Sequence, residues 1–187
     1  MRSVGVEEIG LSFLGESFMA KELLKNAIWW LKDTVKMPYV FLTTNGSLAD
    51  PATVDDCMAA GLDSLKWSVN AADAEQFAQV MQVKPALWEM SLQNLRWARE
   101  VRDAHNYPCR LYASSIRYDG DQHERMQKLL RERVLPYVDE WYELPLYSMG
   151  SIATQREEEL GFKPIAGNQG RVGALRDPLP CWSCFSE

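Results

Sequence analysis

The sequence predicts an α/β fold built from parallel strands, and two observations carry this prediction. Short apolar segments of strand character alternate with longer segments in which apolar residues recur at helical spacing. Each connection between successive strands is longer than about a dozen residues, the length that a parallel crossover requires. Five such strands are too few for a closed eight-stranded barrel. The pattern therefore favours an open, partial barrel or a doubly wound sheet.

The expected strands are separated by helices, with two helices between the third and the fourth strand. Proline and glycine mark the helix over 51–60, because Asp50 is suited to an N-cap, Pro51 to the first helical position and Gly61 to the end. Trp29 and Trp30 widen the apolar face of the first helix, so we expect both rings in the core. The predicted strands are 9–14, 38–44, 63–70, 109–116 and 138–144. The predicted helices are 19–35, 51–60, a short one from about 72, 85–105, 121–135 and 151–160.

Composition and charge limit the classes of function. A chain of 187 residues with 47% hydrophobic and 25% charged residues is typical of one globular domain with a substantial core. The net charge of −6 argues against a general nucleic-acid binder, which needs a basic face. No apolar run approaches the roughly 20 residues of a membrane span, and no secretory signal is present. Cys57 and Cys109 are expected as small buried residues, and we expect a cytoplasmic protein.

Polar residues follow four of the five predicted strands. In parallel α/β folds, ligands bind at the carboxyl ends of the strands, so these residues form the candidate site. The sequence contains neither GxGxxG nor GxxxxGK[ST], so a phosphate cradle is not indicated. The candidate residues are Gly15, Glu16, Thr44, Asn45, Gly46, Ser68, Asn70 and Arg117.

These residue types suit a polar, zwitterionic small molecule. Glu16 could hold an ammonium group, and Arg117 could hold a carboxylate through two parallel hydrogen bonds. Ser68 and Asn70 are two residues apart on one strand, so both point the same way and could bond hydroxyl groups. The sequence therefore predicts a convergent pocket that carries both signs of charge.

Each of these residues also has a purely structural interpretation. Glu16 could cap the following helix, where a carboxylate is favoured by roughly 0.3–1 kcal/mol. Asn45 and Gly46 form a common turn pair. Ser68 and Asn70 could bond to each other.

Two charged residues remain open to more than one role. Arg117 could pair with Asp119 or Asp121 as a surface charge. Lys66 shares its strand face with Ser68, so a Schiff-base role at a barrel site stays open.

The order and spacing of the strand-end motifs resemble the radical SAM superfamily. Gly15 and Glu16 match the last two residues of the family's Gly-Gly-Glu motif, with Leu14 in place of the first glycine. Thr44-Asn45-Gly46 is similar to the second-strand motif, and Gly61-Leu-Asp-Ser-Leu-Lys-Trp-Ser-Val-Asn70 is similar to the strand that follows it. The resemblance covers roughly residues 5 to 184.

The resemblance implies a partial, open (β/α)6 TIM-like barrel that binds S-adenosylmethionine. By the family's pattern, a reduced [4Fe–4S] cluster cleaves this cofactor to methionine and a 5′-deoxyadenosyl radical, which abstracts a substrate hydrogen. Glu16 would meet the methionine amino group. The full set of implied cofactor-binding residues is Gly15, Glu16, Thr44, Asn45, Ser68, Asn70 and Arg117.

The chain departs from the family in its cysteines. The defining CxxxCxxC loop is absent, and in the family it would lie upstream of Met1. We therefore expect a fragment that lacks the first βα unit and the catalytic cluster ligands. Cys181 and Cys184, which follow Pro178-Leu-Pro180, are similar to the entry into a SPASM-type extension and would ligate an auxiliary iron–sulfur cluster. The predicted division is a partial barrel over 1–162 and a linker with the start of that extension over 163–187.

Two other function classes remain open at this stage. One is a catalytically inert α/β module that binds a small molecule. The other is an unrelated barrel enzyme such as an aldolase or a hydrolase. Family members with a SPASM-type extension often modify peptides or proteins, so a peptide or protein substrate is the expectation by analogy.

Overall fold

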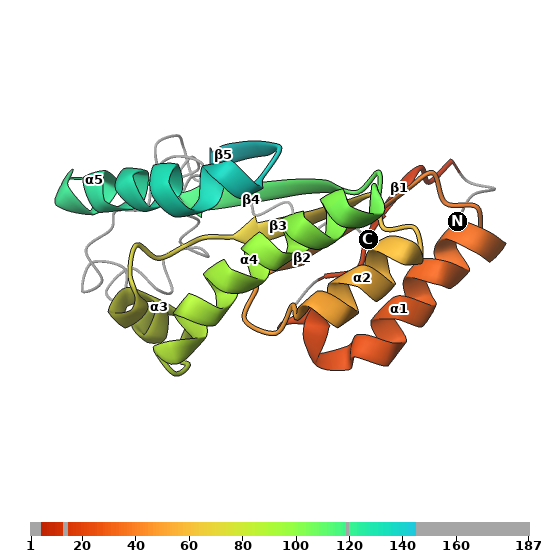
Figure 1. Cartoon of the computed structure of the whole chain (residues 1–187), viewed down its shortest axis with the longest axis horizontal. Helices are drawn as coiled ribbons and strands as arrows, with labels where there is room; N and C mark the ends of the chain where they lie inside the picture. The colour runs from red at the N-terminus through yellow and green to blue at the C-terminus, as the bar shows by residue number, and fades with distance from the viewer. Residues whose placement is uncertain (1–4, 13–14, 119, 145–187) are drawn as a thin grey trace, which may run out of the picture.

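The computed structural model describes residues 5–12, 15–118 and 120–144 (Figure 1). The predicted helix at 151–160, the linker from 163 onward, and both Cys181 and Cys184 lie outside the described residues. Within them, five parallel strands form one sheet in the order β1-β2-β3-β4-β5. The strands are β1 (Glu8–Gly10), β2 (Tyr39–Thr44), β3 (Ser64–Ser68), β4 (Arg110–Ile116) and β5 (Glu140–Leu144).

Helices fill every connection between these strands, as the sequence predicts. Two of them change winding near their ends: a π-helical turn at Trp30–Thr34 continues α1, and another at Leu130–Val134 continues α5. A 3₁₀ turn at Ser17–Ala20 leads into α1, and a second at Leu135–Tyr137 precedes β5. The helices are α1 (Lys21–Trp29), α2 (Pro51–Ala59), α3 (Ala74–Met81), α4 (Ala86–His105) and α5 (Gly120–Leu129).

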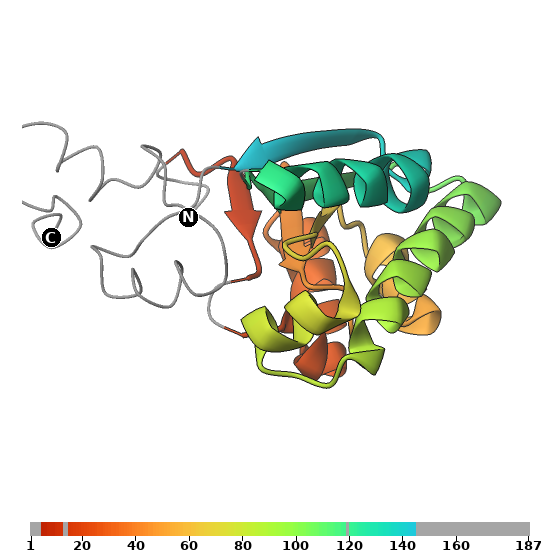
Figure 2. The same ribbon diagram turned by 90° about the vertical axis from the view of Figure 1, so that its left-hand side faces the viewer.

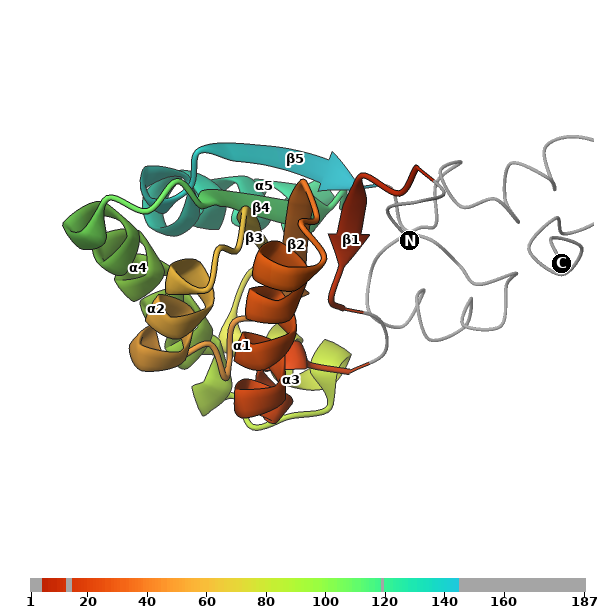
Figure 3. The ribbon, with the colours of Figure 1, turned by 90° about the vertical axis from the view of Figure 1, so that its right-hand side faces the viewer.

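The helices form one layer against one face of the sheet. α2 packs against both α1 and α4, and α4 in turn contacts the end of the α5 segment (Figure 3). Because strand order equals chain order, every crossover moves in the same direction around the sheet, as in a barrel. A doubly wound sheet reverses its order at a switch point. That alternative is therefore wrong for the described residues.

The two faces of the sheet have different character. On the helix face, Val40, Leu42, Leu65, Trp67 and Leu111 are completely buried. On the opposite face, which we call the open face, the residues in register with one another are mostly half-buried or exposed. The open face includes Phe41, Thr43, Lys66, Ser68, Tyr112, Ser114 and Tyr142.

The sheet is not closed within the described residues, because β1 and β5 lie at its two edges (Figure 2). β1 ends at Gly10 instead of extending to 14, although the Leu11 N–H still donates to the Phe41 carbonyl at 3.0 Å. None of the helices in the described part of the chain combines the length and apolar character needed to cross a membrane.

The prediction that Trp29 and Trp30 are core residues is wrong. Their exposed fractions are 54% and 53%, whereas Leu24, Ile28 and Leu31 of the same segment are buried. A short helix in a single layer packs one stripe of side chains against the sheet and its neighbouring helix. Residues one and two positions beyond Ile28 are rotated by roughly 100° and 200° around the axis, away from that stripe.

Candidate functional site

Glu16 connects the end of β1 to the end of β2. Its Oε1 accepts a hydrogen bond from the Thr44 hydroxyl at 2.7 Å, and its Oε2 accepts from the Asn45 N–H at 2.8 Å. Oε1 also accepts from the Phe18 N–H at 3.2 Å, so Glu16 caps the turn that precedes α1. The capping interpretation is therefore correct, and the same carboxylate also lies at the carboxyl ends of two neighbouring strands. Three donors leave part of the acceptor capacity of the carboxylate available to a ligand.

A hollow of about 400 Å³ lies beside Glu16, between β1 and α1. Gly10, Leu23, Leu24 and Ala27 line it together with Glu16. Gly15 precedes Glu16 with φ +88°, and a Cβ there would meet open space. Glycine therefore gives the chain its turn toward the second strand without a packing role.

The Thr44-Asn45-Gly46 loop is held rigidly by α4. The Asn45 carbonyl accepts from the Ser91 hydroxyl at 2.6 Å, and the Gly46 carbonyl accepts from the Asn94 amide at 2.7 Å. Gly46 has φ +79°, and a Cβ at this position would lie 2.0 Å from Trp67 Nε1. The turn pair predicted from the sequence is thus a buried, fixed loop.

The Asn45 side chain points back into its own turn. Its Oδ1 accepts from the Ser47 N–H at 2.9 Å and from the Ser47 hydroxyl at 2.7 Å. The Thr44 hydroxyl, which donates to Glu16, also accepts from the Gly46 N–H at 2.9 Å. The loop therefore presents Glu16 and Asn45 through a network of short, local hydrogen bonds.

Ser68 lies at the end of β3 on the open face, in register with Ser114. The next strand residue, Val69, is buried, and Asn70 is half-buried. The Asn70 carbonyl accepts a hydrogen bond from the buried Tyr118 hydroxyl. No hydrogen bond joins the Ser68 and Asn70 side chains in the described structure, so the interpretation that they bond to each other is wrong.

Arg117 does not lie with Ser68 and Asn70. Ser115 pairs with Glu143 in the strand register, and Arg117 is two residues beyond Ser115. The Arg117 Nε donates to Glu143 Oε2 at 3.0 Å, and Gln127 of α5 donates to the other oxygen of Glu143 at 2.9 Å. Arg117 is therefore directed to the helix side of the sheet, and its partner is Glu143 and not Asp121.

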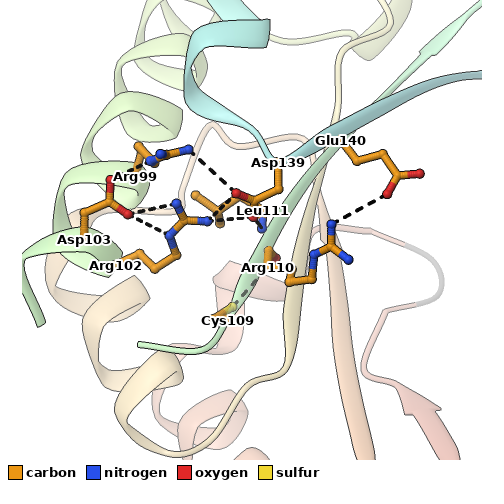
Figure 4. Close-up of polar contacts among 8 residues, drawn as sticks. All are labelled: Arg99, Arg102, Asp103, Cys109, Arg110, Leu111, Asp139 and Glu140. Carbon is orange, nitrogen blue, oxygen red and sulfur yellow. Dashed lines mark hydrogen bonds and ion pairs between the residues drawn. The ribbon is translucent and has the colours of Figure 1, made fainter. Parts of the chain in front are cut away.

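At the amino ends of the strands lies a hollow of about 380 Å³, lined in part by Arg102, Asp103 and Asp139. Figure 4 shows the ion pairs and hydrogen bonds that join these three side chains. Arg102 Nη1 lies 2.6 Å from Asp139 Oδ2, and Arg102 Nη2 lies 2.8 Å from Asp103 Oδ1. Burial alone raises the pKa of the Asp139 carboxyl, but hydrogen bonds from Arg102 and the Leu111 N–H outweigh burial and lower that pKa. These charges satisfy one another, and this edge of parallel barrels serves stability. We therefore place the candidate site at the carboxyl ends.

The described cysteines do not form a metal site. Burial raises the pKa of Cys57 and Cys109 to about 12, so both are protonated thiols, and both are buried as the sequence predicts. In the described part of the chain, no group of three His, Cys, Asp or Glu side chains is suited to hold a metal ion. The residues present therefore do not fit a catalytic [4Fe–4S] cluster, which is commonly held by cysteine thiolates.

Sequence reasoning missed Ser91 and Asn94, which fix the loop after β2. Asn94 is 2% exposed and its Oδ1 has no partner in the described structure. Both residues are polar groups embedded in the apolar stripe of α4. A buried polar residue within such a stripe usually bonds to backbone, and this was the available signal.

Comparisons with known proteins support the fold and not a family. A scan against protein-family models finds no match, and a search of curated proteins finds no matching relative. Among solved structures, the chain is similar to a domain of pyruvate-formate lyase-activating enzyme from Bacteroides vulgatus ATCC 8482. The TM-score is 0.55 at 16% identity, with 83% of this chain and 95% of that chain covered.

Two further structures share the fold. For 2,3-dimethylmalate lyase, a member of the PEP mutase/isocitrate lyase superfamily, the TM-score is 0.52 at 12% identity, with 86% of this chain and 58% of that chain covered. For oxaloacetate acetylhydrolase the TM-score is 0.50 at 12% identity, with 83% of this chain and 56% of that chain covered. At these identities the likeness is one of fold: an open arrangement of parallel strands and helices related to barrel enzymes.

Proposed function

We propose that this chain is part of the core of a radical S-adenosylmethionine enzyme and binds S-adenosylmethionine at the carboxyl ends of its strands. The observation that carries the proposal is the bridge from Glu16 to Thr44 and Asn45. It joins the two motifs that resemble the superfamily across neighbouring strands, in a sheet wound in chain order. The fold likeness to a pyruvate-formate lyase-activating enzyme, a member of that superfamily, supports it.

In the proposed complex, Glu16 accepts hydrogen bonds from the methionine ammonium group through its remaining lone pairs. Gly15 and the fixed loop at Thr44 and Asn45 orient that carboxylate. Ser68 and Asn70 offer donors and acceptors to the ribose or carboxylate. Arg117 is dropped from this set because Glu143 holds it on the helix side.

The cluster is outside what this chain's described residues can supply. A bound [4Fe–4S] cluster would provide the electron that cleaves S-adenosylmethionine. The proposal therefore assigns its ligands to residues that this sequence does not contain, since CxxxCxxC is absent. Cys181 and Cys184 as auxiliary-cluster ligands, and a peptide or protein substrate, remain part of the proposal by resemblance.

Binding of S-adenosylmethionine, measured by isothermal titration calorimetry, tests the proposal. We expect Glu16→Gln to weaken binding by about tenfold or more, because a charged partner of an ammonium is lost. Glu22→Gln is the matched control, since Glu22 is a carboxylate on the neighbouring helix whose side chain is 83% exposed. Absence of binding to the wild-type chain, or equal affinity for wild type and Glu16→Gln, would contradict the proposal. Binding without cleavage, when a reductant is added, would favour the inert binding module.

A second candidate is a barrel enzyme acting on a small carboxylate. Lys66 on the open face favours it, and two of the similar structures are named for enzymes of 2,3-dimethylmalate and oxaloacetate. Treatment with pyruvate and sodium borohydride, followed by mass spectrometry, distinguishes an aldolase of this class. A stable adduct on Lys66 would support a Schiff base, whereas an unmodified Lys66 would reject that mechanism.

A further inference from the structure

Lys66 occupies the centre of the open face. It lies on β3, the middle strand, in register with Thr43 on one side and Tyr112 on the other. Its sequence neighbours Leu65 and Trp67 are fully buried on the helix face, so Lys66 itself is directed away from the helices. The side chain is half-buried.

The ammonium group of Lys66 has no carboxylate partner among the described residues. Within the described part of the chain, the ammonium group lies over the ring of Tyr142, whose centroid is 5.8 Å from Nζ. The other cation in the described strands is Arg110. Its Nη2 lies 3.7 Å from Glu140 Oε2, and its Cζ lies 5.1 Å from the centroid of the Tyr112 ring. Partial burial removes water from a cation, and an anion normally compensates for it. Of the two open-face cations that the structure describes, Lys66 is the one without a described carboxylate partner.

The contact with Tyr142 fixes the direction of the ammonium group. Tyr142 is in register with Ser114, and Ser114 is in register with Ser68. Ser68, Ser114 and Tyr142 thus form a row across three neighbouring strands. Lys66 precedes Ser68 by two residues, so its side chain leans along β3 toward this row. The Ser68 hydroxyl lies in that row, one strand from the β2 end that Glu16 contacts. Neighbouring strands are about 4.8 Å apart.

Lys66 and Ser68 can both donate hydrogen bonds on the open face. Glu16 lies apart from them, because the hydroxyl that donates to it belongs to Thr44, which is in register with the buried Trp67 of the helix face. Arg117, the cation that the sequence favoured for a carboxylate, is paired with Glu143 at 3.0 Å on the other side. Among the cations of the five strands and their ends that the structure describes, this leaves Lys66, in the middle of β3, for an incoming anion.

We propose that Lys66 and Ser68 form an anion subsite on the open face, which binds the carboxylate of a small-molecule ligand. The carboxylate could belong to S-adenosylmethionine or to a separate substrate. The inference rests on the proposed function only where the ligand is S-adenosylmethionine. Binding of a separate carboxylate does not depend on that function. In this arrangement Lys66 orients the ligand through its carboxylate and takes no covalent part.

Calorimetric titrations with three ligands distinguish the two possible sources of the carboxylate. S-adenosylmethionine carries the nucleoside and a carboxylate, 5′-methylthioadenosine carries the nucleoside without the amino acid, and succinate carries carboxylates alone. The variants are Lys66→Met, which removes the charge, and Lys66→Arg, which keeps it. Arg110→Met is the matched control, because it removes a paired cation from the same face. Circular dichroism checks that each variant folds.

We expect Lys66→Met to weaken the carboxylate ligand by about tenfold or more and to leave 5′-methylthioadenosine unchanged. Lys66→Arg and Arg110→Met should retain the affinity within about threefold. Loss confined to S-adenosylmethionine assigns the subsite to the cofactor, and loss confined to succinate assigns it to a separate ligand. If Lys66→Met binds every ligand like the wild type, or weakens 5′-methylthioadenosine equally, the subsite is refuted.

The outcome for the subsite is distinguishable from the outcome for the proposed function. Succinate binding that depends on Lys66, with neither nucleoside bound, would uphold the subsite and reject the S-adenosylmethionine proposal. Binding of S-adenosylmethionine that depends on Glu16 and is indifferent to Lys66, with no succinate binding, would do the reverse. A chain that binds none of the three ligands refutes both.

Discussion

The amino ends and the carboxyl ends of the strands differ in how their charged side chains are paired. At the amino ends of the strands, Asp63 and Asp139 use the same arrangement: each carboxylate accepts from a backbone N–H of the preceding strand and pairs with a cation of a preceding helical segment. Among the described residues, Glu16 at the carboxyl ends accepts only from neutral donors, and Lys66, in the middle of β3, contacts an aromatic ring in place of a carboxylate. The amino ends thus hold carboxylates paired with cations, whereas Glu16 and Lys66 lack a partner of opposite charge among the described residues, although Arg117 and Glu143 pair with each other near the carboxyl ends.

The paired charges at the amino ends and the unpaired groups on the open face are expected to affect different quantities, stability and binding. A carboxylate that accepts from backbone and pairs with a partly buried cation holds strand and helix together. An unpaired charge contributes nothing of that kind and is retained at a cost. We therefore expect substitutions at the amino ends to lower the free energy of unfolding, and substitutions on the open face to change binding instead. The fixed loop after β2 is the exception, since it serves the site and is also packed into the core.

The largest effect is expected from Gly46→Ala. A Cβ would lie 2.0 Å from Trp67 Nε1 and 2.5 Å from Ser91 Oγ, and the residue already has φ +79°. We expect the free energy of unfolding to fall by about 3 kcal/mol or more in urea denaturation. Gly15→Ala is the control with the same backbone strain and open space around the Cβ, and should cost about 1–2 kcal/mol. Equal losses would show that the loop is not packed as described.

The next effect is expected from Asp139→Ala. The variant leaves Arg102, whose side chain is 12% exposed, without its shortest ion pair, and it removes the acceptor of the Leu111 N–H. We expect a loss of about 2 kcal/mol in the free energy of unfolding. Asp33→Ala breaks an exposed pair with Lys36 at 3.8 Å and should cost less than about 0.5 kcal/mol. A loss at Asp139 as small as that at Asp33 would contradict the stabilising role of this edge.

Acid should weaken the structure through lowered carboxyl pKa values. Burial opposes the shift at Asp50, but hydrogen bonds from Lys21 and Thr53 lower its pKa to about 2, and the pKa of Asp139 is also lowered. A lowered folded-state pKa contributes stability that is present above the unfolded value of about 3.9 and is lost as pH falls through the folded value. We expect the unfolding free energy to decline from about pH 5 toward pH 2. Asp139→Asn should flatten this decline, and an unchanged slope would exclude the contribution of Asp139.

The smallest effect on stability is expected from Ser68→Ala. No hydrogen bond of the Ser68 hydroxyl is present in the described structure, so the free energy of unfolding should change by less than about 0.5 kcal/mol. Under the proposals above, the same substitution weakens ligand binding. A large loss of stability here would mean that the open face carries structural bonds, and the contrast between the two edges would fail.

Local sequence patterns were sufficient for much of the architecture. Alternation of apolar strands with helical periodicity predicts five parallel strands, and Asp50 with Pro51 marks the start of α2, as observed. The placement of Glu16 near Thr44 also follows from the sequence, because the carboxyl ends of neighbouring parallel strands meet at one edge. These properties depend on residues close together in the chain.

The tertiary structure decided on which face of the sheet each side chain lies and which partner it contacts. Ser68 ends β3 and Arg117 follows β4, yet Ser68 is in register with Ser114 on the open face, and Arg117 pairs with Glu143 on the helix side. Trp29 and Trp30 are as apolar as the core residues of the same helical segment, yet packing in a single layer buries Leu24, Ile28 and Leu31 and leaves both tryptophans exposed. Register and packing are long-range properties, since they depend on which segments meet and at what offset. The sequence by itself therefore determined the kind of fold and the end of the strands at which the candidate site lies, whereas only the assembled sheet showed that Lys66 is on the open face and that Arg117 is paired with Glu143 on the helix side.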